Sequence, residues 1–317
     1  MRRIDVFNGD ADGLCALRQL RLAEPAVSEL VTGVKRDIAL LARVAARPGD
    51  LVTVLDVSLE RNRAALLRLL GNGVRVRYFD HHFAGEIPSH AGLEAHIDTS
   101  PGTCSSMLVD RHLGGRFRRW AVAAAFGDGL DQPALELGAT IALDPAEIEK
   151  LRELGRSLNY NAYGETEADL LVPPARLYRE LATYDDPLQF VAASALYGRL
   201  NAGRHADLDA ALAVPARWTA QGGEVYVLPE APWSRRVNGT FANALARQHP
   251  GRAAAVLTPT GGGYVVSVRV PAGARTSADE FCRSFAGGGG RKEAAGIDRL
   301  PAADLESFVR RFARAFG

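Results

Sequence analysis

The sequence lacks features that define several classes of protein. Its 317 residues include only three cysteines, Cys15, Cys104 and Cys282, which are far apart and have no CxxC spacing. This pattern argues against a disulfide framework or a zinc site, and we expect buried free thiols in a reducing compartment. No apolar run approaches the roughly 20 residues that span a bilayer, and the first residues show no signal-peptide h-region. We therefore expect a cytoplasmic protein with no membrane partner.

A basic excess is also missing. The 38 Lys and Arg residues are balanced by 37 Asp and Glu residues, which leaves a formal net charge of +1. Proteins that hold a long nucleic-acid backbone usually carry a strong positive excess, because phosphate neutralisation dominates their affinity. Arg116, Arg118 and Arg119 form one small basic cluster. The charge balance favours a small anionic substrate over a stable complex with long nucleic acid.

What the sequence does contain is a series of short apolar runs that each lead into acidic side chains. The runs and the residues that follow them are 4–7 with Asp10 and Asp12, 51–55 with Asp56, 74–79 with Asp80, His81 and His82, and 121–126 with Asp128. Runs of this length predict buried strands. In an open parallel sheet, ligands bind at the carboxyl ends of the strands. We therefore expect these side chains to meet at one edge.

Helical patterns separate the expected strands. Residues 13–23, 37–46 and 59–70 carry apolar side chains near helical spacing, and residues 27–34 form a further candidate strand. This alternation predicts an α/β fold with a doubly wound, mainly parallel sheet.

A change of composition near residue 220 predicts a second, smaller α/β domain. It combines strand-like runs at 224–228, 253–257 and 264–270 with helical segments at 238–248 and after Ser277. We place the first domain at 1–190, a linker at 191–221 and the second domain at 222–317.

The acids and histidines predict a site for two divalent cations. Asp10 and Asp12 would each face a different cation across a tight loop, Asp56 would bridge both, and His81 and Asp128 would complete one of the two sites. Without cations, converging carboxylates would raise each other's pKa. Carboxylate and imidazole ligands suit Mn²⁺ or a similar ion, and a cation pair can bind a phosphate and activate a water. An isolated DxDG or a His pair is more often structural, so the ordered combination carries the prediction.

A glycine run near the C-terminus predicts a substrate-binding loop. Gly288, Gly289 and Gly290 leave backbone N–H groups open for a phosphate or a base, and Arg291 follows them. Arg269 on the preceding strand can pair with a phosphate. A flexible surface turn and an exposed surface arginine are the alternative interpretations.

These motifs, in this order, resemble those of the DHH/DHHA1 phosphoesterases. The matching residues are DADG at 10–13, Asp56, the DHH triplet at 80–82, Asp128, and GGGRKEAAG at 288–296. The superfamily includes RecJ-type single-strand exonucleases, nanoRNA-degrading oligoribonucleases that also act on pAp, and dinucleotide phosphodiesterases. The resemblance spans nearly the whole chain, with the DHH domain preceding a DHHA1 domain.

The resemblance also implies a role for each matching residue. Asp10, Asp12, Asp56, His81 and Asp128 would be manganese ligands. Asp80 would support the metal cluster, and His82 would contact the scissile phosphate or assist the leaving group. Arg269, Gly288, Gly289, Gly290 and Arg291 would bind the rest of the nucleotide. Metal-bound hydroxide would then attack in line, and Mg²⁺ or Co²⁺ are alternatives to Mn²⁺.

Three positions depart from the family pattern. Val6 stands where the nanoRNase branch usually has a histidine, and Asn8 where the RecJ branch usually has an acid. We therefore expect one metal site to be weaker or differently completed. Arg291 replaces the histidine of GGGH and can bind a phosphate through two parallel hydrogen bonds.

Together these features predict a Mn²⁺-dependent phosphodiesterase that cuts short linear nucleotides to mononucleotides. A RecJ-like exonuclease on longer single strands, a pAp phosphatase and a non-catalytic nucleotide-binding protein are the alternatives. The sequence leaves open the preferred base, DNA or RNA, substrate length, direction of attack and the formation of a homodimer.

Overall fold

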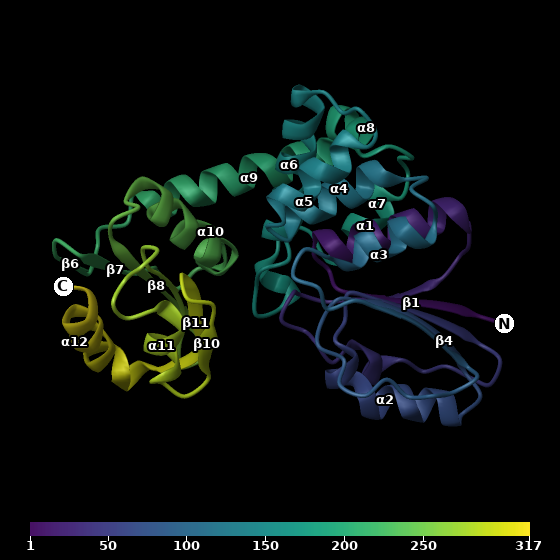
Figure 1. Cartoon of the computed structure of the whole chain (residues 1–317), viewed down its shortest axis with the longest axis horizontal. Helices are drawn as coiled ribbons and strands as arrows, with labels where there is room; N and C mark the ends of the chain where they lie inside the picture. The colour runs from purple at the N-terminus through teal and green to yellow at the C-terminus, as the bar shows by residue number, and fades with distance from the viewer. The chain divides into compact units, whose positions relative to one another are not determined.

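The computed structural model describes all 317 residues, which form two compact units, Met1–Ala202 and Gly203–Gly317. Each unit has its own sheet and core (Figure 1). Residues 191–221, the expected linker, include the end of α8 (Pro187–Ala193), all of α9 (Ala195–Leu212) and the short β6 (Trp218–Thr219). None of the helices has the length and apolar composition needed to cross a membrane.

The first unit is built on a five-stranded sheet in which every neighbouring pair is parallel, as predicted. Its order is β2-β1-β3-β4-β5, and the strands are β1 (Arg3–Phe7), β2 (Glu29–Val31), β3 (Leu51–Leu55), β4 (Arg75–Asp80) and β5 (Leu93–Ile97). β5, which the sequence analysis did not single out, forms an edge. Because all strands run the same way, their carboxyl ends share one side of the sheet.

Helices cover both faces of this sheet (Figure 1). The helices are α1 (Ala11–Ala23), α2 (Leu59–Gly71), α3 (Ser105–His112), α4 (Arg118–Gly127), α5 (Asp131–Ala139), α6 (Pro145–Tyr160) and α7 (Pro174–Leu181), with 3-10 turns at Leu40–Arg43 and Glu167–Asp169. One core joins Phe7, Leu55 and Phe79 to α1, α3, α4 and α6. A separate core joins Val54 and Tyr78 to α2. Neighbouring residues of one strand thus face opposite cores, which explains the continuous apolar runs.

Two expected elements were assigned wrongly. Residues 121–126, expected as a strand, belong to helix α4, because alanine has the highest helix propensity. Asp128 nevertheless directly follows the segment, as the C-cap of this helix. Residues 37–46, expected as a helix, contain only the 3-10 turn at Leu40–Arg43. The side chain of Asn62 accepts from Leu41 N–H (3.1 Å) and donates to Ile38 C=O (2.6 Å), so it satisfies backbone groups that a helix would have paired.

The second unit contains a six-stranded mixed sheet of order β10-β11-β9-β8-β7-β6. Its further elements are β7 (Gly223–Val227), α10 (Pro232–Gln248), β8 (Ala253–Thr260), β9 (Gly263–Arg269), α11 (Ala278–Arg283), β10 (Gly288–Gly290), β11 (Ala294–Pro301), a 3-10 turn at Ala302–Asp304, and α12 (Leu305–Phe316). Phe281, Phe308, Phe312 and Phe316 pack against the sheet. Ser277 caps α11 by accepting a hydrogen bond from Glu280 N–H (3.4 Å).

The glycine run is an edge strand rather than the open loop expected. Gly288, Gly289 and Gly290 form β10 and pair with residues 295–297 of β11. A Cβ on Gly288 would lie 1.8 Å from the carbonyl oxygen of Cys282, and Gly290 has φ +148°. A Cβ on Gly289 would meet nothing within 4 Å. Close packing against α11 and an unusual backbone angle therefore require glycine at two of these positions.

Candidate metal centre

The carboxyl end of β1 leads into Asp10, which forms the N-cap of α1. Its Oδ1 accepts hydrogen bonds from the N–H groups of Asp12 and Gly13, both at 3.1 Å. This is the usual capping arrangement for aspartate at a helix start. A Cβ on Gly13 would lie 2.1 Å from the carbonyl oxygen of Asn8. The DADG motif thus combines a cap with a close backbone approach that excludes any larger residue.

Asp12, in the first turn of α1, is held by the N-terminus of α3. Its two oxygens accept from the N–H groups of Ser105 and Ser106, both at 2.7 Å, and Ser106 Oγ donates to the Asp12 carbonyl at 2.8 Å. A helix N-terminus favours a carboxylate through its free N–H groups and its dipole. Sequence reasoning missed both serines. A small polar pair before an apolar helical run was the available signal.

Asp56 follows β3 in a left-handed conformation, with φ +57°. Its N–H donates to Phe79 C=O at 3.0 Å, and its Oδ1 accepts from Ser105 Oγ at 3.3 Å. Such a backbone is uncommon for residues other than glycine, although aspartate and asparagine adopt it more readily than most. Surrounding contacts therefore hold Asp56 in place, with the residue only 2% exposed.

β4 delivers Asp80, His81 and His82 in succession. Asp80 is fully buried; its Oδ1 lies 2.7 Å from His82 Nδ1, and its Oδ2 accepts from Leu59 N–H at 3.3 Å. The hydrogen bond to Asp80 raises the pKa of His82 above its ordinary value and outweighs the opposing effect of burial. Asp80 therefore orients one ring nitrogen of His82, whose side chain is 46% exposed.

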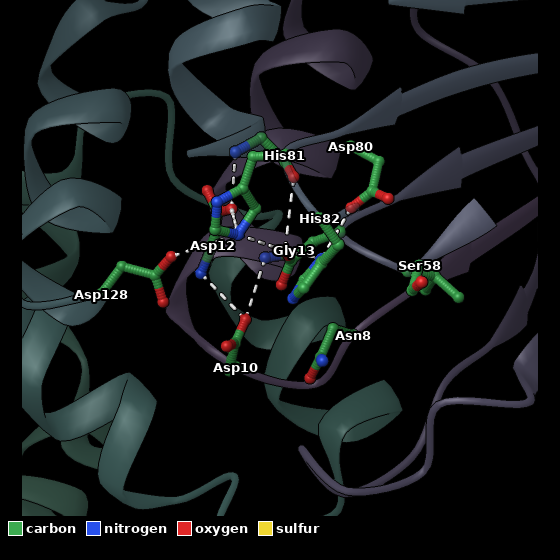
Figure 2. Close-up of polar contacts among 12 residues, drawn as sticks. Asn8, Asp10, Asp12, Gly13, Ser58, Asp80, His81, His82 and Asp128 are labelled. Atoms are coloured by element: carbon green, nitrogen blue, oxygen red, sulfur yellow. Dashed lines mark hydrogen bonds and ion pairs between the residues drawn. The ribbon is translucent and has the colours of Figure 1, made fainter. Parts of the chain in front are cut away.

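Carboxylates from separate elements surround His81. Its Nε2 lies 3.3 Å from Asp56 Oδ1, 3.5 Å from Asp128 Oδ2 and 4.0 Å from Asp12 Oδ2. Figure 2 shows Asp12, His81 and Asp128 pointing toward one another. Ligand atoms of these three residues lie within 4.8 Å of one another, as do those of Asp56, His81 and His82. The oxygen and imidazole donors fit a divalent cation such as Mn²⁺.

The electrostatics of the centre also favour a cation. Burial raises the pKa of Asp56 well above its ordinary value, and the charges of Asp10, Asp12 and Asp128 add to this effect. Burial likewise raises the pKa of Asp128. Converging carboxylates repel one another, and a divalent cation would relieve that repulsion.

A lysine that sequence reasoning did not single out also belongs to this centre. Lys35 Nζ lies 2.5 Å from Asp10 Oδ2 and 3.4 Å from Asp128 Oδ1. Lys35 follows the short β2 in an irregular segment. An isolated lysine in a loop carries no motif, so the sequence offered no signal for this contact.

The predicted substrate-binding residues all lie in the second unit. Arg269 is on β9, where its Nε donates to Asn243 Oδ1 at 2.7 Å. Arg291 follows β10, and its N–H donates to Ala294 C=O at 2.8 Å in the turn that joins β10 to β11. Their role in binding a nucleotide stays a prediction.

Comparison with known proteins identifies solved structures that resemble this fold. No family model and no curated protein sequence matches the chain. Among solved structures, exonuclease RecJ bound to manganese is similar with a TM-score of 0.61 and 21% identity, over 100% of this chain and 91% of that chain. The pGpG-specific phosphodiesterase PggH from Vibrio cholerae has a TM-score of 0.56 and 14% identity, over 99% of each chain.

RecJ from Thermus thermophilus in complex with Mn²⁺ is similar with a TM-score of 0.58 and 21% identity. The match covers 99% of this chain but 52% of that one. Each of these three matches extends over 99–100% of this chain, and so over both of its compact units. The chain therefore shares the fold of these RecJ and PggH structures.

Proposed function

We propose that the protein is a metal-dependent phosphodiesterase that hydrolyses short linear nucleotides, such as dinucleotides, to mononucleotides. The convergence of Asp12, Asp56 and Asp128 on His81 carries this proposal. The structural neighbours support it, since RecJ is an exonuclease and PggH a pGpG-specific phosphodiesterase. The near-neutral charge favours a short substrate over a long strand.

Asp12, Asp56, His81 and Asp128 would hold one cation, and Asp10, the fifth predicted ligand, would face the other cation of the predicted pair. Mn²⁺ is our first choice, with Mg²⁺ and Co²⁺ as alternatives, and the two-cation centre stays a prediction. When bound, a divalent cation supplies a water of lowered pKa and polarises a phosphoryl oxygen. Asp12 is oriented by α3, and Asp56 by its backbone and Ser105, so protein groups position both of these carboxylates.

His82 would provide a proton to the leaving oxygen. Asp80 fixes its Nδ1, which leaves Nε2 for the substrate, and the raised pKa of His82 keeps a larger protonated fraction near neutral pH. A positioned general acid typically contributes a factor of roughly 10²–10⁴. Arg269, Gly288, Gly289, Gly290 and Arg291 would bind the remaining nucleotide within the 222–317 domain. A cytoplasmic location is part of the same proposal.

The strongest alternative is a RecJ-like exonuclease on longer single strands, because a manganese-bound RecJ matches over the whole of this chain. That activity predicts comparable rates on 5-mers and 30-mers and binding that weakens steeply with salt. A dinucleotide-specific enzyme would instead lose rate as the substrate lengthens.

The test is a substrate panel with purified protein and Mn²⁺: pGpG, pApA, a 5-mer, a 30-mer and pAp. We expect pGpG and pApA to be split, and Asp80→Ala or His81→Ala to reduce the rate by about 10²-fold or more. His249→Ala, at an exposed position in the second unit, is the matched control and should retain activity. Equal rates for wild type and the His81→Ala variant would refute the proposal.

A further inference from the structure

Lysine is rare in this chain, yet one lysine lies among the carboxylates of the metal centre. The 38 basic residues include lysine only at positions 35, 150 and 292. Lys150 is exposed on α6, whereas the side chain of Lys35 is 28% exposed and contacts both Asp10 and Asp128. An ammonium is a compact point charge, unlike the broad guanidinium fork of arginine. Of the two basic side chains, lysine comes closer to a metal ion in size.

Groups outside the carboxylate cluster hold Lys35 in this position. Its N–H donates to Ala162 C=O at 2.9 Å, and its C=O accepts from Asn8 Nδ2 at 3.4 Å. Its ammonium donates to Asn159 Oδ1 at 3.1 Å and lies 5.8 Å from the ring centroid of Tyr163. Lys35 is therefore anchored through both its backbone and its charged end. An acid at position 8 could not donate the bond that Asn8 makes.

Asp10 already has partners for both of its oxygens. Oδ1 accepts the two capping hydrogen bonds of α1, and Oδ2 accepts from Lys35. Asp10 belongs to neither of the two groups of ligand atoms that converge on His81.

We propose that the Lys35 ammonium takes the place of one divalent cation, so that the centre works with a single cation held by Asp12, Asp56, His81 and Asp128. This inference rests on the proposed function and specifies its metal requirement.

Asp128 would contact both positive charges of the centre, the Lys35 ammonium and the divalent cation, through different oxygens. Its Oδ1 faces Lys35 at 3.4 Å, and its Oδ2 faces His81 at 3.5 Å. One carboxylate thus lies between the ammonium and the proposed cation ligands. A fixed ammonium compensates Asp10 without any metal, which leaves the remaining carboxylates for the cation.

The number of bound Mn²⁺ ions tests this inference independently of turnover. Chelator-treated protein is titrated with Mn²⁺, and the bound metal is followed by elemental analysis and electron paramagnetic resonance. We expect about one tightly bound Mn²⁺ per chain, with the hyperfine pattern of an isolated ion. Lys35→Ala should bind a second Mn²⁺ and give the spectrum of a magnetically coupled pair. Lys150→Ala, the matched lysine control, should resemble the wild type.

Two results would overturn the inference: a coupled pair in the wild type, or a single Mn²⁺ in the wild type that Lys35→Ala does not increase. Lys35→Met, which keeps the length of the side chain, serves if Lys35→Ala does not fold, and the wild-type spectrum is decisive in any case. If the wild type binds a coupled pair of Mn²⁺ ions and hydrolyses pGpG, the inference about Lys35 is wrong while the proposed function stands. A protein that binds one Mn²⁺ and splits none of the panel would contradict the proposed function alone.

Discussion

Asp80 Oδ1 and His82 Nδ1 are joined by a 2.7 Å hydrogen bond at the end of β4. Asp80 is completely buried, and its other oxygen accepts from the N–H of Leu59 at the start of α2. His82 by contrast has a side chain that is 46% exposed. Asp80 is thus a buried carboxylate with a hydrogen-bond partner on each oxygen, and it positions an imidazole that is accessible to a substrate.

Asp80→Asn should shift the pH profile of the reaction. The hydrogen bond and charge of Asp80 raise the pKa of His82, so removing the charge lowers that pKa. Because protonated His82 would act as the general acid, kcat should fall at alkaline pH, where His82 loses its proton. We expect this alkaline limb to move to lower pH in Asp80→Asn, with kcat near pH 8 reduced roughly 10-fold or more. Asp98→Asn is the control, and an unmoved limb would exclude His82 as the acid.

Asp56→Asn should stabilise the metal-free protein. Folding raises the pKa of Asp56, so the folded state keeps its proton over a pH range in which the unfolded chain has lost it. The metal-free protein therefore loses stability as pH rises from the ordinary aspartate pKa through the raised one. Asparagine removes this loss and tolerates a positive φ better than most residues.

At pH 7 we expect the Tm of metal-free Asp56→Asn to rise by a few degrees, since roughly 1 kcal/mol shifts Tm by about 2–4 °C in a domain of this size. Mn²⁺ should raise the Tm of the wild type but not of the variant. Thermal melts with and without Mn²⁺ measure both effects, with the exposed Asp131→Asn as control. A metal-free variant that melts below the wild type would argue against uncompensated repulsion at Asp56.

Gly13→Ala should disrupt the metal centre. The added methyl would lie 2.1 Å from the carbonyl oxygen of Asn8, so the backbone that carries Asp10 and Asp12 must move. We expect a loss of about 1–3 kcal/mol in stability and a clear loss of Mn²⁺ affinity. Gly239→Ala, in helix α10 with nothing within 4 Å of the added methyl, should instead gain roughly 0.5–1 kcal/mol. Melting curves and Mn²⁺ titrations that failed to separate the two variants would refute this explanation of the DADG glycine.

Neighbouring glycines of β10 allow packing and substrate binding to be separated. Gly288→Ala should destabilise the second unit, because its Cβ would lie 1.8 Å from the carbonyl oxygen of Cys282. Gly289→Ala should leave the Tm unchanged. If the strand binds nucleotide, Gly289→Ala and Arg291→Ala should raise KM for pGpG several-fold while the Tm stays constant. An unchanged KM in both variants would remove β10 from the substrate site.

Three strands of the parallel sheet, β1, β3 and β4, were predictable because each is a short apolar run that leads into acidic residues. Val54 and Tyr78 face one core and Leu55 and Phe79 the other, so burial on both faces removes polar residues from the run. The same property explains the error at residues 121–126. A short run that is apolar throughout has no period, and buried strands and buried helices then look alike. The sequence also correctly indicated three free, buried cysteines.

The partners of the predicted ligands were harder to predict. Ser105, Ser106 and Lys35 reach the centre from loops and a helix start, where no periodic pattern exists. Lys35 is 25 positions from Asp10, and Ser105 is 93 positions from Asp12. Only the folded topology brings such residues together. The acids can therefore be identified from motifs in a single sequence, whereas the distant groups that position them cannot.

The contact between Asp12 and the start of α3 has a consequence for folding. The carboxylate is oriented only after a chain segment of more than 90 residues has closed, because the two N–H donors come from Ser105 and Ser106. A divalent cation bound through Asp12 would therefore not serve as a template for the early chain. In refolding experiments the ion should be captured in a late kinetic phase, after the helices and the sheet have already docked.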